Sequence, residues 1–444
     1  MEILSSRKVL IVFCLLAHLG FSQTISDCKK RFDTYLNFRG ALNGSVVFER
    51  DAIYLLNEKG KKELVIYAAE IPILAEFFAN STFKQQEELI HKKGLIRYNK
   101  YQRDSLLIYT DDKKPYHFKY DKLLKGYKIA LDPGHFSTNL TDARIEQKYL
   151  YFLWDSLKDP TDTVKLFESV LTFNTAMHLK TLLENQGAEV FMTRSQNDHT
   201  SFDCTYNDWI KHRKRKCLDS LKENGGITAD RYKQLIRATD HKFFWDFFRD
   251  YDLANRARKI NRFNPHLTVI IHYNVDEANE PWKKPSEKNY TMAFIGGAVT
   301  ADSFRKTEGK INFLRLLLTS QINQSEKLAA ATVKNFNKEL GIPIASQFDA
   351  AYLRDNCIAT SSPGVFSRNL ILCRKVNSPL VYGEGLYQDN VRESKTLMQT
   401  KDDVYGIKSN LRLAAVARSY YMAVIDFIKS GALGYERNLP QTNP

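Results

Sequence analysis

YKIALDPGH, residues Tyr127–His135, is the stretch of sequence that decides the fold. Its apolar run, Ile129–Leu131, stops at the tripeptide DPG, which is followed by His135. Proline has no amide hydrogen for a sheet ladder and glycine permits a sharp turn, so we predict a buried strand that ends in a tight corner. Because α/β sheets bind ligands and metals at the carboxyl ends of their strands, His135 is a candidate site residue.

Two later stretches have the same form. Leu267–Asn274 (LTVIIHYN) is a β-branched run that carries His272, and Leu380–Gly385 (LVYGEG) is an apolar run that carries Glu384 between two glycines. Parallel strands present their carboxyl ends at one edge of a sheet. The sequence therefore predicts that three strands each bring a metal-ligating or acid–base residue to a common edge.

The segment after His135 predicts how these strands are connected. Thr163–Gln186 carries apolar residues at helical spacing, Gly187 is placed as a C-cap glycine, and Ala188–Thr193 is typical of a strand. Strand, helix and strand in this order form a βαβ unit, which requires parallel strands. We predict an α/β fold with a mixed, mostly parallel sheet and helices on both faces.

The rest of the chain falls into segments that differ in hydrophobic pattern and composition. Residues 24–124 contain short alternating segments, including Ser105–Tyr109, and predict a small strand-rich or mixed domain. Residues 195–250 are polar, basic and aromatic, and predict an inserted helical hairpin hinged at two consecutive glycines. We also expect helices at Ile145–Leu157, Ser325–Leu340 and Ser409–Lys429, and a strand at Thr291–Ile295. The predicted boundaries are a signal peptide at 1–23, the N-terminal domain at 24–124, a catalytic domain at 125–429 and a C-terminal tail at 430–444.

Composition sets limits on the partners. The chain has 444 residues, 43% of them hydrophobic, which is ordinary for a globular protein of two or three domains. Its net charge of +14 suits an anionic partner such as an acidic membrane surface or an anionic envelope polymer. The sequence contains no zinc finger or RNP motif, so we expect no nucleic-acid partner.

The N-terminus predicts export. Residues 1–23 have a basic start, an apolar run at Val9–Leu16 and a small-residue end, which is the pattern of a secretory signal peptide. The apolar run is short for a membrane span, although an uncleaved anchor is the alternative, and no later run is long enough to form one. We expect a periplasmic or cell-envelope protein without a transmembrane segment after signal removal. In such a compartment, two sequence-local pairs, Cys204 with Cys217 and Cys357 with Cys373, are open disulfide candidates.

The strand-end residues match the needs of a metal-dependent hydrolase. Two histidines and a carboxylate are the smallest usual protein ligand set of a catalytic zinc, which keeps a further position open for water. A second carboxylate outside the ligand set is needed to accept the proton of that water. His135 and His272 provide the imidazoles, Glu384 is one candidate carboxylate, and either Glu146 or Glu168 is the other.

Four blocks of the chain carry a resemblance to a known family. They are, in order, KIALDPGH (128–135), FESVLTFNTAMHLKTLLENQGAEVFMTR (167–194), LANRARKINRFNPHLTVIIHYN (253–274) and SPLVYGEGLYQDN (378–390). Through them, residues of about 125–429 resemble the zinc-dependent N-acetylmuramoyl-L-alanine amidases, the type 3 amidases of bacterial cell-wall turnover. The resemblance implies hydrolysis of the amide between N-acetylmuramic acid and L-alanine in peptidoglycan, during cell-wall turnover or division.

The resemblance also implies roles for single residues. His135, Glu168 and His272 match the ligands of one zinc ion, and Glu384 matches the general base. Because the segment between His135 and Glu168 is longer than the usual short loop of the family, Glu146 stays open as the alternative carboxylate ligand. Asn274 and Arg374 are candidate substrate-binding residues.

Two other functions stay open at this point. The chain could be a zinc hydrolase that cuts another bond of the peptidoglycan stem peptide. It could also be a non-catalytic cell-wall-binding or regulatory protein that keeps an amidase-like fold. The presence of all four central residues favours the enzyme.

Overall fold

The computed structural model describes residues 23–91, 122–153, 163–279, 284–399, 402–404 and 407–433. The predicted strand at Ser105–Tyr109, nearly all of the predicted signal peptide and most of the predicted tail lie outside these residues. The chain forms two compact units: residues 1–114 with 297–322, and residues 115–296 with 323–444.

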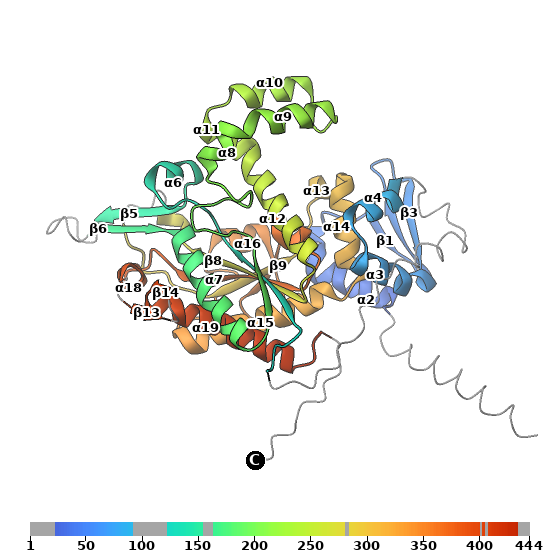
Figure 1. Cartoon of the computed structure of the whole chain (residues 1–444). Coiled ribbons are helices and arrows are strands. Elements are labelled where there is room, and N and C mark those ends of the chain that lie inside the picture. The colour runs from blue at the N-terminus through green and yellow to red at the C-terminus, as the bar shows by residue number, and fades with distance from the viewer. Residues whose placement is uncertain are drawn as a thin grey trace, which may run out of the picture. The chain divides into compact units, whose positions relative to one another are not determined.

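The first unit contains a three-stranded antiparallel sheet in the order β1-β2-β3 together with short helices (Figure 1). This agrees with the strand-containing N-terminal region expected from the sequence. Its elements are α2 (Ile25–Arg31), the π-helical turn η2 (Phe32–Leu36), η3 (Phe38–Gly40), β1 (Val46–Phe48), β2 (Ala52–Leu56), β3 (Lys62–Tyr67), η4 (Ala68–Glu70), α3 (Ile71–Asn80), α4 (Phe83–His91), α13 (Ala301–Arg305) and α14 (Thr307–Leu318).

Helices α13 and α14 of this unit come from a later part of the chain, which the sequence-based boundaries assigned to the catalytic domain. Every residue of α14 from Ile311 to Leu318 is buried. The Arg31 guanidinium donates to the carbonyl of Leu317 at 2.8 Å, and Lys310 pairs with Glu63. A helix that is apolar on nearly all sides must be enclosed, and here the N-terminal segment helps to enclose it.

The second unit is built on a seven-stranded sheet in the order β10-β11-β9-β12-β8-β4-β7. The pairs β12–β8, β8–β4, β4–β7 and β11–β9 are parallel, whereas β10–β11 and β9–β12 are antiparallel. The predicted mixed, mostly parallel sheet is therefore confirmed. The strands are β4 (Lys128–Pro133), β7 (Glu189–Met192), β8 (Leu267–Asn274), β9 (Met292–Gly296), β10 (Cys357–Ala359), β11 (Val365–Arg368) and β12 (Leu380–Tyr387).

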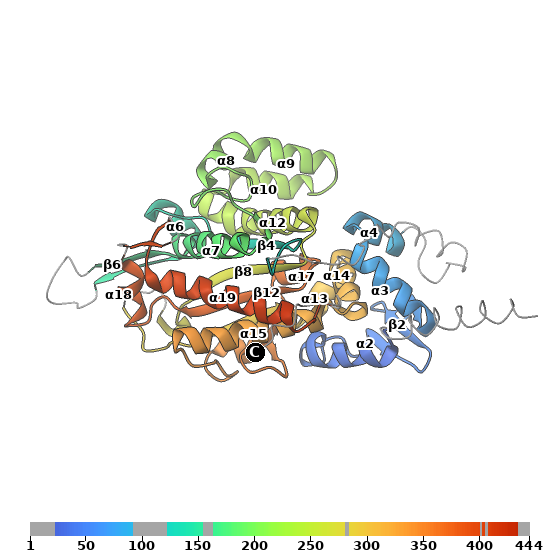
Figure 2. The ribbon, with the colours of Figure 1, turned by 60° about the horizontal axis from the view of Figure 1, so that its bottom comes forward.

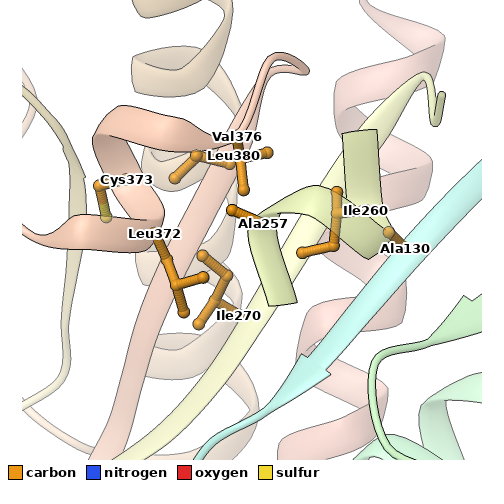
Figure 3. Close-up of a cluster of buried hydrophobic side chains, with 8 residues drawn as sticks. All are labelled: Ala130, Ala257, Ile260, Ile270, Leu372, Cys373, Val376 and Leu380. Carbon is orange, nitrogen blue, oxygen red and sulfur yellow. The ribbon is translucent and has the colours of Figure 1, made fainter. Parts of the chain in front are cut away.

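Helices cover both faces of this sheet, as predicted (Figure 2). On one face, α12 (Arg249–Phe263) and α17 (Ile371–Lys375) enclose an apolar cluster (Figure 3). The cluster consists of Ala130, Ala257, Ile260, Ile270, Leu372, Cys373, Val376 and Leu380. On the other face lie α7 (Glu168–Asn185), α15 (Gln321–Leu340) and α19 (Leu411–Lys429). The three central strands that carry the candidate residues are thus enclosed on both sides.

The segment between His135 and Glu168 differs from the sequence-based expectation. The expected helix at Ile145–Leu157 is wrong, and the helix expected from Thr163 begins later, at Glu168. Instead, α6 (Leu140–Glu146) is followed by an antiparallel hairpin of β5 (Tyr149–Leu153) and β6 (Thr163–Phe167). Burial alternates along β5, where Leu150 and Phe152 are buried and Tyr151 between them is exposed, so period two prevails over helical spacing.

The insertion at residues 195–250 folds as consecutive helices (Figure 1). They are α8 (Tyr206–His212), α9 (Lys214–Glu223), α10 (Ala229–Arg237), α11 (Asp240–Phe243) and the π-helical turn η8 (Phe244–Phe248), which runs on into α12. Their aromatic side chains form a buried cluster with Phe136, from the loop after His135. The dense aromatic sequence is therefore explained mainly by packing of the insertion's helices on one another, with Phe136 joining the cluster from outside the insertion.

The second unit contains five further described elements. They are η9 (Glu277–Asn279), α16 (Ala351–Asn356), α18 (Glu393–Met398), β13 (Asp402–Val404) and β14 (Ile407–Ser409). None of the described helices is long and apolar enough to cross a membrane. Among the described cysteines, the two sequence-local pairs are unpaired thiols rather than disulfides.

Candidate metal centre

Three side chains converge at the carboxyl edge of the parallel strands. His135 follows β4, Glu168 is the first residue of α7, and His272 lies in β8; one ligand atom from each falls within 4.8 Å of the others. Glu168 Oε1 lies 3.0 Å from His272 Nδ1 and 3.3 Å from His135 Nε2. These are the residues that the sequence predicted as ligands, and the carboxylate lies between the two imidazoles.

The hairpin β5–β6 explains how Glu168 reaches this position despite its distance along the chain. Tyr149 pairs with Phe167 at the open end of the hairpin, so the added residues leave and return at the same place. The Glu168 amide then donates to the carbonyl of Lys148 at 3.4 Å. The additional residues between His135 and Glu168 therefore form a hairpin, and Glu168 remains the first residue of its helix.

Both oxygens of Glu168 are held by donors. The Tyr273 amide donates to Oε1 at 3.2 Å, and the Gln388 side-chain amide donates to Oε2 at 3.2 Å. Such outer contacts orient a metal-binding carboxylate. Strand alternation does not predict the position of Gln388, because the register of β12 shifts between Glu384 and Tyr387, just before this residue.

His272 fits closely between two neighbours. Its ring stacks on Tyr382 of the adjacent strand, with centroids 4.3 Å apart and planes at 8°. On another side, a β-carbon added at Gly134 would lie 2.2 Å from His272 Cε1, which is far inside contact distance. Residue 134 must therefore be glycine for this imidazole to occupy its place.

His135 has an unusual backbone. Its φ is 58°, in the left-handed region that costs energy for any residue with a side chain. Arg256 donates to the carbonyls of Pro133 at 2.8 Å and His135 at 3.4 Å, and Arg194 donates to the carbonyl of Gly134 at 3.2 Å. These buried guanidinium groups satisfy the turn's carbonyls and stabilise its strained conformation.

Glu146, the alternative ligand, lies on the far side of the His135 ring. Its Oε1 is 2.9 Å from His135 Nδ1, whereas Glu168 faces Nε2. Burial alone would raise the pKa of Glu146, but the charge of His135 and hydrogen bonds from His135 and Ser137 lower this pKa to about 2. The geometry therefore places Glu168 between both histidines and Glu146 next to only one of them.

Glu384 lies beside this cluster. It occupies the position of β12 that pairs with His272 on β8, and residues paired in this way project from the same face of a sheet. Glu384 is buried, and within the described residues its Oε2 has no hydrogen-bond partner. Burial, followed by the nearby charge of Glu168, raises the pKa of Glu384 to about 8.

The electrostatics of the cluster suit a cation. Burial lowers the pKa of His135, but the charges of Glu168 and Glu146 outweigh burial and raise this pKa to about 9. Burial lowers the pKa of His272 to about 4, because its hydrogen bond with Glu168 compensates only in part. The raised pKa keeps a proton on His135, between the carboxylates of Glu168 and Glu146. A divalent cation could take the place of this proton.

The donor set fits zinc. Two imidazole nitrogens and one carboxylate oxygen are ligand types that Zn²⁺ prefers, and three protein ligands leave a position for water or substrate. Among the described residues, the unpartnered Oε2 of Glu384 is an unused acceptor on the strand next to His272.

The two predicted substrate-binding residues lie in different places. Asn274 ends β8, close to His272, and its side-chain amide donates to the Tyr352 hydroxyl at 2.8 Å. Arg374 lies on α17, before the start of β12, and its guanidinium donates to Asn369. The structure thus brings Asn274 to the edge that carries the cluster but places Arg374 near the opposite end of β12.

Comparisons with known proteins agree with this picture. A family model described as N-acetylmuramoyl-L-alanine amidase matches residues 129–408, more than half of the chain. No curated protein sequence matches the chain.

Solved structures similar to this chain include three amidases. The CwlD amidase from Clostridioides difficile, solved in complex with the GerS lipoprotein, is 16% identical with a TM-score of 0.35, covering 68% of this chain and 99% of that one. The apo form of Ami1 from Mycobacterium abscessus is 13% identical with a TM-score of 0.38, covering 69% and 100%. The catalytic domain of CwlV from Bacillus (Paenibacillus) polymyxa is 13% identical with a TM-score of 0.35, covering 68% and 98%.

Proposed function

Because the chain belongs to the N-acetylmuramoyl-L-alanine amidase family, we propose that it hydrolyses, with one zinc ion, the amide between the lactyl group of N-acetylmuramic acid and L-alanine. The observation that carries this proposal is the convergence of His135, Glu168 and His272 within 4.8 Å, with Glu384 on the neighbouring strand. The family assignment makes the chain an amidase of peptidoglycan. The zinc ion, the individual roles and the bond are our proposal.

In this proposal, His135 Nε2, His272 Nδ1 and a Glu168 oxygen hold the ion. When bound, zinc supplies a Lewis acid that polarises the amide carbonyl and makes a water molecule more acidic. Tyr273 and Gln388 keep the Glu168 carboxylate in place through their hydrogen bonds. Tyr382 and Gly134 restrict the His272 ring to one orientation.

Glu384 is the proposed general base. It accepts the proton of the attacking water and returns it to the amine of L-alanine when the amide bond breaks. A base works best when its pKa is close to the working pH, and burial beside Glu168 raises the pKa of Glu384 to about 8. Its unpartnered oxygen leaves an acceptor free for this task among the described residues.

Export to the envelope is part of the same proposal, since the substrate lies outside the cytoplasmic membrane. The basic, apolar and small-residue pattern of residues 1–23 supports it. The net charge of +14 supports contact with anionic envelope polymers as well as with peptidoglycan.

The test is digestion of purified peptidoglycan by the full chain, with mass spectrometry of the new ends. We expect muramic acid with a free lactyl carboxylate and stem peptides with a free L-alanine amine. New ends within the stem peptide would instead indicate a hydrolase of another stem-peptide bond. Chelation should stop the digestion, and zinc added back should restore it.

A further inference from the structure

We infer that Glu146 is a positioning residue of the proposed zinc site, which directs His135 Nε2 at the metal, and that the aromatic insertion at 195–250 holds Glu146 in place. This inference rests on the proposed zinc site and adds an outer contact to it. Glu146 is not among the residues whose ligand atoms converge on one point.

The first argument is the geometry of the His135 ring. Glu146 Oε1 lies 2.9 Å from Nδ1, and Glu168 Oε1 lies 3.3 Å from Nε2, on the other side of the ring. A neutral imidazole carries one proton, so a carboxylate that accepts the Nδ1 proton leaves the Nε2 lone pair for a metal. Glu146 therefore selects both the tautomer and the orientation of His135.

The second argument is the way in which Glu146 itself is held. Its Oε2 accepts hydrogen bonds from the amides of Phe136 and Ser137, both at 3.2 Å, and from the Ser137 hydroxyl at 2.7 Å. The side chain is buried, with 5% of its surface exposed. Together with the His135 ring nitrogen, four donors surround this buried carboxylate. Only the ionised acid, which carries no proton of its own, can accept a hydrogen bond from all of them.

The third argument is the contact with the insertion. The Trp245 indole donates to the carbonyl of Ile145 at 3.0 Å, directly before Glu146. The Phe136 ring packs against Tyr206 and Phe244, each with centroids 5.9 Å apart. The insertion thus contacts both chain segments that surround the Glu146 carboxylate, so it supports the geometry of His135 from outside the sheet.

The substitution Glu146→Gln tests the inference with little change in size. The amide brings two hydrogen atoms into a place where every neighbour is a donor, so at least one donor loses its acceptor and the His135 tautomer is no longer selected. Loss of such an outer contact weakens metal binding about 10-fold to 100-fold in comparable sites. We expect a loss of this size in zinc affinity.

Glu326→Gln is the matched control. Glu326 is also buried in the second unit and accepts hydrogen bonds from the hydroxyls of Ser361 and Ser362, at 2.7 and 2.9 Å. Its hydroxyl partners, Ser361 and Ser362, are not among the proposed zinc ligands. We expect this variant to lose stability but to keep the zinc affinity of the unaltered chain.

The experiment measures zinc dissociation constants by competition with a chromophoric chelator, on the full chain and each variant. Thermal unfolding in excess chelator reports the stability of the metal-free forms separately. Trp245→Phe, which removes the hydrogen bond to Ile145 and reduces the ring that contacts Phe244 and Arg249, should weaken zinc binding about twofold to tenfold. It provides a second test if Glu146→Gln does not fold.

The outcomes are distinct. Weaker zinc binding in Glu146→Gln and Trp245→Phe, with unchanged binding in Glu326→Gln, supports the inference. Unchanged binding in Glu146→Gln, or in Trp245→Phe where Glu146→Gln is unfolded, overturns it, as does an equal loss in the control. An unaltered chain that binds no zinc overturns the proposed zinc site, and with it this inference.

Discussion

The two histidines of the cluster are held by different parts of the molecule. His272 is inside β8, where sheet pairing fixes its backbone and Tyr382 stacks on its ring. His135 lies beyond the end of β4 in a left-handed conformation, and side chains from outside the sheet hold it. The difference indicates that strand register secures one half of the site, whereas the other half depends on hydrogen bonds and on a packed insertion.

The largest effect is expected in the half that the sheet secures. His272→Ala removes one of three proposed ligands, and we expect zinc binding to be lost and hydrolysis to fall by about a thousandfold or more. Metal analysis of the purified protein and release of L-alanine ends from peptidoglycan measure these changes. His212→Ala, on the exposed surface of α8, is the control and should retain both.

Glu384→Gln separates chemistry from metal binding in the same half. We expect hydrolysis to fall by about 10² to 10⁴, because a positioned base contributes a factor of this size. Zinc content should stay at one ion per chain, since Glu384 is not a proposed ligand. Unchanged hydrolysis with bound zinc would show that another group accepts the proton.

Gly134→Ala tests the contact between the two halves. The added β-carbon would lie 2.2 Å from His272 Cε1, so the imidazole or the turn must move. We expect a loss of about 1–3 kcal/mol in the free energy of unfolding, as for other overpacked sites. Zinc affinity should fall at the same time, and chemical denaturation with chelator competition measures both. An unchanged zinc affinity would mean that the His272 ring tolerates displacement.

The smallest effect is expected in the half held from outside. Phe136→Leu reduces packing between the His135 loop and the insertion, and we expect it to cost about 1–2 kcal/mol of stability. Zinc affinity should fall severalfold, because looser packing of this side chain lets the backbone amide of residue 136, which donates to Glu146, shift. Phe191→Leu is the matched control, since the Phe191 ring on β7 stacks on Phe263 with centroids 5.2 Å apart. It should lose similar stability but no zinc affinity.

The sequence predicted the central features because they are encoded locally. The apolar runs before His135, His272 and Glu384 predicted the strands, and the helical pattern that ends before Gly187 predicted a connection between parallel strands. The expected mixed sheet with helices on both faces is confirmed. The helix expected at Ile145–Leu157 is wrong, because its apolar residues alternate with period two once paired with β6.

Other features depend on residues far apart in the chain. Sequence spacing left Glu146 and Glu168 as alternatives, and only the hairpin β5–β6 places one between both histidines and the other behind His135. Gln388 donates a hydrogen bond to Glu168, but it follows a register shift near the end of β12. The alternation of side chains along the strand therefore does not predict its position.

The sequence by itself determined which candidate residues lie in or directly after the central strands, since strand periodicity and turn-forming residues act over a few neighbouring positions. Only the tertiary structure decided which carboxylate lies between the imidazoles, that the aromatic insertion supports the His135 loop, and that residues 297–322 join the N-terminal unit. The physical reason is that these arrangements depend on packing and hydrogen bonds between segments whose separation along the chain carries no information about their distance in space.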